Sequence, residues 1–113
     1  MNNVNNLKIY RKVEVLIDKV YPRIRKFPRS EIHGLSLHIK KALFDLLEKL
    51  SLANAVRSKR KHYAFEADAA LHRFRSLFRL ARRSNYLSKG FYEDVSLDIT
   101  EISKMLTGYI KTA

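Results

Sequence analysis

Basic side chains recur along one side of the segment from Arg57 to Arg83, and these are the residues in the chain with the clearest potential for chemistry. An α-helix turns by about 100° per residue, so these side chains fall within an arc roughly 100° wide and about 39 Å long. Guanidinium groups at this spacing can each bind a phosphate of a nucleic-acid backbone. The pattern predicts a nucleic-acid-binding surface made of Arg57, Lys61, His72, Arg75, Arg79, Arg82 and Arg83.

The overall charge favours the same kind of partner. The formal net charge is +12, from 23 Lys and Arg against 11 Asp and Glu, which indicates a polyanionic ligand. Between Leu71 and Ser84 there are five Arg and no acid, whereas a solvated helix face ordinarily mixes both signs. We expect RNA or DNA, with an acidic protein as the alternative. A membrane ranks lower, because the apolar side of this helix is needed for a core.

Catalytic and metal-binding patterns are weak by comparison. His62 and Glu66 have the spacing that places two side chains on one helix face, but no third ligand follows at a useful distance. His33 and His38 are five residues apart and do not share a face. The chain has no Cys, no nucleophile elbow and no Gly-rich phosphate loop. We expect a protein that is not an enzyme and that uses no metal or cofactor.

Long amphipathic segments must position these residues. With only 3 Gly and 2 Pro, the sequence predicts an all-α fold, an antiparallel up-down-up-down four-helix bundle in a single domain over residues 1–113. The expected helices cover about 6–26, 31–55, 58–83 and 89–111. Ser30, Ser58 and Ser88 are candidate N-caps, and Pro22 predicts a kink or an early end of the first helix.

Each expected helix carries an apolar stripe at helical spacing, which predicts the core. In the segment 58–83 the stripe consists of Tyr63, Ala67, Ala70, Phe74, Leu77 and Ala81. Two further sets fall outside the stripes. Lys12, Lys19 and Arg23 on the first helix would extend the nucleic-acid surface. Four apolar residues lie where a monomer would expose them, and they suggest contacts between protomers: Leu37, Phe44, Phe65 and Leu80.

The sequence also bears on location. The first residues contain no uninterrupted apolar segment typical of a signal peptide, and no apolar run reaches the length of a transmembrane helix. We therefore expect a cytoplasmic protein that does not cross a membrane.

Several short motifs together resemble a known family. They are Tyr21-Pro22 followed by Phe27-Pro28-Arg29; Lys61-His62-Tyr63 leading into Glu66-Ala67-Asp68; Phe74 with Leu77 to Ala81; and Glu101 to Leu106 with Gly108-Tyr109-Ile110. From about Val13 to Lys111 the chain resembles the accessory variability determinant (Avd) proteins of diversity-generating retroelements. These belong to a wider set of bacterial four-helix bundles, some encoded in intervening sequences of 23S ribosomal RNA genes.

The resemblance implies a specific role. Avd proteins are non-enzymatic partners of a retroelement reverse transcriptase. They form homopentamers and bind the template-repeat RNA during adenine-targeted cDNA synthesis and retrohoming. The resemblance places the basic end of the third helix, Arg75 to Arg83, at the nucleic acid. It also offers the wider set as an alternative, with ribosomal RNA or an acidic protein as partner. Thr107, Gly108 and Tyr109 stand where many Avd-like sequences have two glycines and a Trp.

Overall fold

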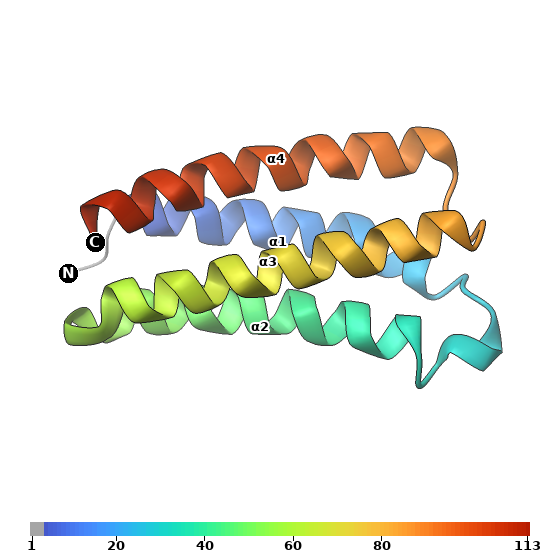
Figure 1. Ribbon diagram of the computed structural model, residues 1–113, viewed down its shortest axis with the longest axis horizontal. Helices are drawn as coiled ribbons and strands as arrows, with labels where there is room; N and C mark the ends of the chain where they lie inside the picture. The colour runs from blue at the N-terminus through green and yellow to red at the C-terminus, as the bar shows by residue number, and fades with distance from the viewer. Residues whose placement is uncertain (1–3) are drawn as a thin grey trace.

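Four long α-helices form an antiparallel bundle in the computed structural model, which describes residues 4–113 (Figure 1). The first three residues of the predicted 1–113 domain lie outside this range. The bundle measures 42 × 25 × 19 Å, and the described residues contain no strand. The predicted all-α, up-down-up-down architecture is confirmed. The helices are α1 (Val4–Ile24), α2 (Leu35–Ala55), α3 (Arg60–Arg83) and α4 (Lys89–Thr112), with short 3-10 helices η1 (Arg29–Glu31) and η2 (Arg57–Lys59) in two connections.

Neighbouring helices follow the order of the chain around the bundle. α2 packs against α1 and α3, and α4 packs against α3 and α1. α1 and α3 therefore lie diagonally opposite each other. The C-terminal ends of α1 and α3 lie at the same end of the bundle, where α2 and α4 begin (Figure 1). Basic residues on α1 and α3 consequently occupy different corners of the molecule.

The predicted apolar stripes form the core. On α3, Ala67, Ala70, Phe74 and Ala81 are buried, while Tyr63 and Leu77 are only half-buried. The buried side is wider than the predicted stripe because α3 contacts two neighbouring helices, and it also includes Ala64, Leu71 and Phe78. Small buried residues on α3 allow α2 to approach closely along much of its length.

The first helix ends earlier than predicted. α1 continues through Pro22 and stops at Ile24 rather than at residue 26. Pro22 has no N–H to donate to the carbonyl of Asp18, so the last turn of the helix is weakened. The helix does not end at the proline itself, and the predicted kink stays a prediction.

The predicted start of the second helix, at residue 31 with Ser30 as its cap, is wrong. Residues 29–31 form η1, and α2 begins only at Leu35. The N-cap position is Gly34, which has no side chain to cap with. The carboxylate of Glu31 serves instead, and its Oε1 accepts a hydrogen bond from the Leu35 N–H at 3.1 Å. Its Oε2 accepts from the Tyr86 hydroxyl at 2.8 Å, and this bond raises the pKa of Tyr86. A partner 55 residues away therefore holds the cap in place.

The third helix also begins later than predicted. Ser58 lies in η2, and α3 begins at Arg60. The Arg60 guanidinium donates to the Ala53 carbonyl at 2.9 Å and to the Asn54 carbonyl at 3.2 Å. Carbonyls in the last turn of a helix have no helical N–H partner, so Arg60 satisfies the end of α2 from the start of α3.

The turn between α3 and α4 has well-defined ends. Asn85 adopts a positive φ of 64°, which Asn tolerates better than most residues. The N–H groups of Asn85 and Tyr86 donate to the carbonyls of Arg82 and Ala81, each at 3.0 Å, and close the end of α3. Ser88 is the predicted N-cap of α4, and its Oγ accepts from the Phe91 N–H at 3.2 Å.

Candidate nucleic-acid interface

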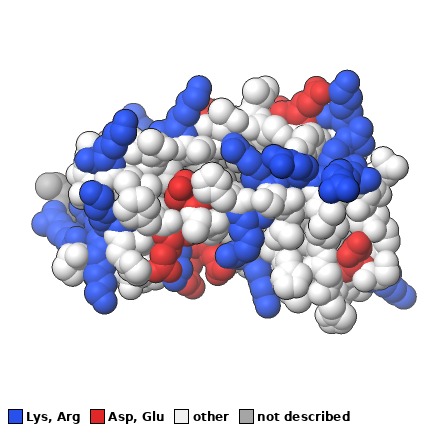
Figure 2. All heavy atoms as spheres, in the orientation of Figure 1, with Lys and Arg blue, Asp and Glu red and all other residues white. Residues whose placement is uncertain are grey.

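Four arginines line the C-terminal half of α3: Arg75, Arg79, Arg82 and Arg83. Arg79 and Arg83 are exposed, and the other two are half-buried. No ion pair joins any of the four to a carboxylate of residues 4–113. Figure 2 shows Lys and Arg gathered in a band over this half of α3, while most carboxylates visible on the same face lie toward the other end of the molecule. We call these four residues the arginine row.

Local sequence explains why the arginine row has no acidic partner. From Ala69 to Tyr92 the chain contains no Asp or Glu, so no carboxylate lies within one helical turn of the row on α3. One member is held in position by the following turn: Arg82 Nη1 donates to the Leu87 carbonyl at 3.0 Å. That bond leaves other N–H groups of the guanidinium available for a ligand.

The N-terminal half of α3 is different, because its basic residues alternate with acids. His62 Nε2 lies 2.6 Å from Glu66, and His72 Nε2 lies 3.5 Å from Asp68. Glu66 also pairs with Lys49 of α2 at 3.3 Å, and this contact raises the pKa of Lys49. The predicted arc is therefore interrupted. Arg57 and Lys61 are exposed but separated from the arginine row by these pairs, and His72 is engaged by one of them.

Arg73 also differs from the arginine row, although it lies in the same segment. Its guanidinium pairs with Asp45 of α2. Arg73 is two residues from Arg75, a step of about 200° around the helix, so it projects toward α2 rather than toward α4. The structure thus separates Arg73, which pairs with α2, from the arginine row, which no carboxylate of residues 4–113 reaches.

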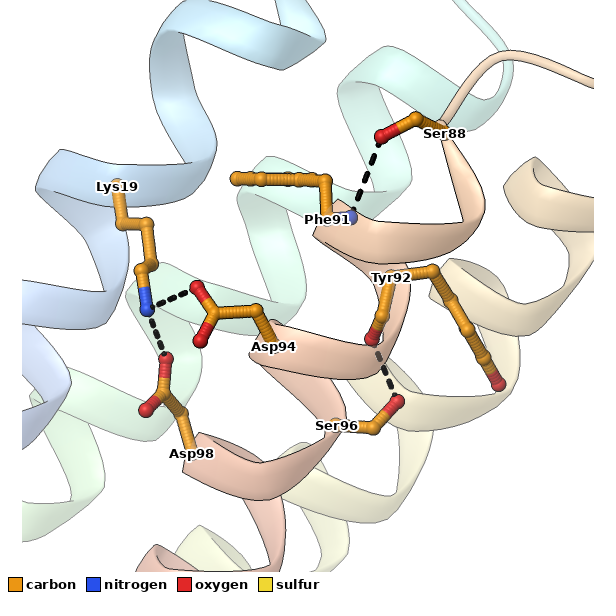
Figure 3. Close-up of polar contacts among 7 residues, drawn as sticks. All are labelled: Lys19, Ser88, Phe91, Tyr92, Asp94, Ser96 and Asp98. Atoms are coloured by element: carbon orange, nitrogen blue, oxygen red, sulfur yellow. Dashed lines mark hydrogen bonds and ion pairs between the residues drawn. The ribbon is translucent and has the colours of Figure 1, made fainter.

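The basic residues predicted on α1 are paired with α4. Lys12 lies 2.7 Å from Glu101, and Lys19 lies 2.7 Å from Asp94 and 2.8 Å from Asp98. Figure 3 shows Lys19 reaching between these two aspartates. Hydrogen bonds to Asp94 and, with a smaller effect, to Asp98 raise the pKa of Lys19 above its ordinary value.

Arg23 of α1 has an aromatic partner on α4. Its guanidinium carbon lies 4.3 Å from the centre of the Phe91 ring, a cation–π geometry. Lys12, Lys19 and Arg23 therefore lie away from the arginine row, and each has a partner on α4. Their role in binding nucleic acid stays a prediction.

The four predicted interface residues all reach the surface of this single chain. Phe44, Phe65 and Leu80 are 48%, 54% and 44% exposed, and Leu37 is half-buried. The ring of Phe44 lies 6.0 Å from that of Tyr21, so it is directed toward α1. Other exposed apolar residues were not singled out by the sequence patterns, and the most exposed are Val15 and Leu97. Contact between protomers stays a prediction.

The described residues contain neither a metal-binding cluster nor a membrane-spanning helix. Among residues 4–113, no three His, Cys, Asp or Glu side chains cluster in a way that could hold a metal ion. In the same part of the chain, no helix combines the length and the apolar character needed to cross a membrane.

The fold and the charge distribution define a small, basic four-helix-bundle protein. The sequence model of the bAvd-like family matches residues 7–113, and the chain belongs to this family. A crystal structure of a protein of unknown function from the S23 ribosomal protein family of Bacteroides thetaiotaomicron has the same fold, with a TM-score of 0.83. That match covers 96% of this chain and 99% of the other at 19% identity. No curated protein matches the chain.

Proposed function

We propose that this protein is a non-enzymatic accessory factor of the Avd type, which binds the template RNA of a retroelement and associates with its reverse transcriptase. Membership of the bAvd-like family supports this role. The role would lie in mutagenic cDNA synthesis and retrohoming, inside the cytoplasm, with no metal or cofactor. The protein would hold RNA, or DNA, in place while the polymerase supplies the chemistry.

The observation that carries the proposal is the arginine row, with its lack of carboxylate partners among residues 4–113. Arg73, on the same helix, does reach an acid, Asp45 of α2. Arginines without such partners repel one another, and a bound phosphate backbone would offset this repulsion and release counterions. The row spans eight residue steps, or about 12 Å along the helix axis, which suffices for several phosphates.

A homopentamer would fit the same role. Five copies of a chain with a net charge of +12 would repel one another strongly, so polyanion binding would also stabilise the assembly. Phe44, Phe65, Leu80 and Leu37 are the proposed contacts between protomers. Light scattering that gives a monomer at micromolar concentration would contradict the pentamer without affecting the arginine row.

The decisive experiment reverses the charge of the row. We expect Arg75→Glu, Arg79→Glu, Arg82→Glu and Arg83→Glu together to weaken RNA binding at least ~100-fold at moderate salt, because four phosphate contacts become repulsive. A gel-shift or anisotropy titration measures the affinity, and circular dichroism checks the helical fold.

The matched control carries Lys8→Glu, Lys41→Glu, Lys59→Glu and Lys104→Glu. These four lysines are exposed, and none has an ion-pair partner in the described part of the chain. The control changes the net charge equally, so it should weaken RNA binding far less. Equal losses in the two variants would show that total charge, and not the arginine row, governs binding.

A second candidate function comes from the structural neighbour. That protein is described as a member of the S23 ribosomal protein family, which favours ribosomal RNA as a ligand. An acidic protein partner belongs to the same alternative. The genomic neighbourhood separates the candidates. A reverse transcriptase gene beside paired near-identical repeats, differing mainly at adenines, supports the Avd role, and an intervening sequence within a 23S ribosomal RNA gene supports the alternative.

A further inference from the structure

Two acid-free stretches of sequence meet at one end of the bundle. Residues 19–30 contain five Lys and Arg and no acid, and residues 69–92 contain six and no acid. The first stretch ends α1 and enters the following connection, and the second ends α3 and begins α4. Because α1 and α3 run in the same direction, both basic ends lie at the right of Figure 1. The arginine row therefore shares this end of the bundle with a second basic group, which consists of Arg25, Lys26 and Arg29.

The two connections contact each other directly. The rings of Phe27 and Tyr86 lie 5.2 Å apart, and the Tyr86 hydroxyl donates to Glu31 at 2.8 Å. Glu31 is the carboxylate nearest in sequence to the second basic group, and it is already engaged by Tyr86 and by the Leu35 N–H. Glu31 therefore caps a helix, and two further acids near this end, Glu93 and Asp94 of α4, pair with Lys89 and Lys19.

The second basic group is available to a ligand. Arg25, Lys26 and Arg29 are exposed, and none forms an ion pair with a carboxylate of residues 4–113. Arg25 lies 5.9 Å from the Tyr21 ring, a loose contact that leaves its N–H groups accessible. Lys26 and Arg29 flank the buried Phe27, so packing of that ring fixes their position at the bundle end.

Aromatic rings at this end pack against other side chains. The half-buried Tyr21 ring lies 6.0 Å from the Phe44 ring and 5.1 Å from the Lys40 ammonium. Phe27 is buried, and the Arg23 guanidinium covers the Phe91 ring at 4.3 Å. The Tyr92 ring stacks on Phe78, with centroids 5.8 Å apart and an interplanar angle of 14°. Proteins that bind single strands generally use exposed aromatic rings as stacking platforms, whereas duplexes are recognised mainly through backbone and shape. This end of the bundle therefore presents exposed cations, whereas its aromatic residues are buried or half-buried at Tyr21, Phe27, Phe78, Phe91 and Tyr92.

We propose that the basic end of the bundle, formed by Arg25, Lys26 and Arg29 together with the arginine row, binds the phosphate backbones of a nucleic-acid duplex. The inference rests on the proposed function and adds three ligand-binding residues and a preferred form of ligand. A duplex carries one charge per ~1.7 Å of its axis, twice the density of either strand, so it suits a compact cluster of cations. The short dimensions of the bundle, 25 and 19 Å, limit how much single strand the cluster could follow.

The test combines two ligands and two charge-reversed proteins. The ligands are an RNA duplex of about 20 base pairs with mixed sequence and one of its strands alone, each followed by fluorescence anisotropy in a salt series. The first variant is Arg25→Glu, Lys26→Glu and Arg29→Glu. The control is Lys8→Glu, Lys59→Glu and Lys104→Glu, exposed lysines outside the basic end with the same change of charge. A milder set, Arg25→Gln, Lys26→Gln and Arg29→Gln, serves if the first variant unfolds.

We expect wild type to bind the duplex more tightly than the single strand at equal salt. The first variant should lose about tenfold or more in duplex affinity relative to the control, and the Gln set should lower the salt slope by about 2 to 3. Equal binding of both ligands would overturn the duplex preference. Equal loss in variant and control would overturn the role of Arg25, Lys26 and Arg29, while a loss in the arginine-row variant would still support the proposed function.

Discussion

The basic faces of α1 and α3 look alike in sequence but differ in their surroundings. Lys12 and Lys19 of α1 each lie within 2.8 Å of carboxylates on α4. The arginine row of α3 has no such partner among the described residues. α4 packs against both helices, so the difference arises from how α4 distributes its own side chains.

The two edges of α4 have different chemistry. The acids Asp94, Asp98 and Glu101 meet α1, as their ion pairs show. At about 100° per residue, the edge next to α3 carries hydroxyl residues instead. Two of these bond back to their own helix: Ser96 Oγ donates to the Tyr92 carbonyl at 2.8 Å (Figure 3), and Thr100 Oγ1 donates to the Ser96 carbonyl at 3.0 Å. The lesson is that a basic helix face becomes a candidate ligand surface only where its neighbours bring no carboxylate.

Among changes to the basic face of α1 that pairs with α4, Lys19→Glu should reduce stability the most. It removes two ion pairs and places a third negative charge beside Asp94 and Asp98, which should lower the free energy of unfolding by about 1.5 kcal/mol. Urea denaturation measures the loss, with Lys104→Glu as a control of equal charge change. RNA affinity should fall no more than in that control. A selective fall in RNA affinity would instead place α1 on the nucleic-acid surface.

A smaller effect is expected from adding a carboxylate to the C-terminal half of α3, which has none. Ser76→Glu introduces an acid three residues before Arg79, within ion-pair reach on the exposed side of the helix. Competition for the arginine row should weaken RNA binding about fivefold, with a slight gain in helix stability. Ser51→Glu on the exposed side of α2 is the control. If both substitutions reduce affinity equally, local pairing is unimportant and only net charge matters.

The smallest expected effect is the loss, at alkaline pH, of the stability that the Lys19 ion pairs contribute. The pKa of Lys19 is raised in the folded protein, so its contribution to stability is complete below the ordinary lysine value of 10.5 and is lost as pH rises through the higher folded value. The advantage of wild type over Lys19→Gln, about 0.5–1 kcal/mol at neutral pH, should therefore shrink above that range. Lys19→Arg should retain the advantage, because arginine stays protonated. An advantage that is unchanged at high pH would contradict the ion-pair origin.

Much of the fold follows from helical periodicity alone. The predicted core residues Ala67, Phe74 and Ala81 are buried because residues three and four apart share a helix face wherever the helix packs. The cap at Ser88 is equally local, since the hydroxyl meets an N–H three residues on. The start of α2 could not be predicted in this way. Its cap needs Glu31 to be held by Tyr86, a contact between distant parts of the chain.

For the candidate site, the sequence by itself determined that basic residues recur along α3 and that residues 69–92 contain no acid. It could not determine which cations would be paired, because Lys19 and Asp98 are 79 residues apart and meet only when α1 packs beside α4. The tertiary structure decided that Lys12 and Lys19 of α1 pair with α4, that the arginine row stays without a carboxylate partner among residues 4–113, and that the C-terminal ends of α1 and α3 lie at the same end of the bundle. Helical phase is set by local hydrogen bonds, whereas pairing across helices depends on which faces the hydrophobic core brings into contact.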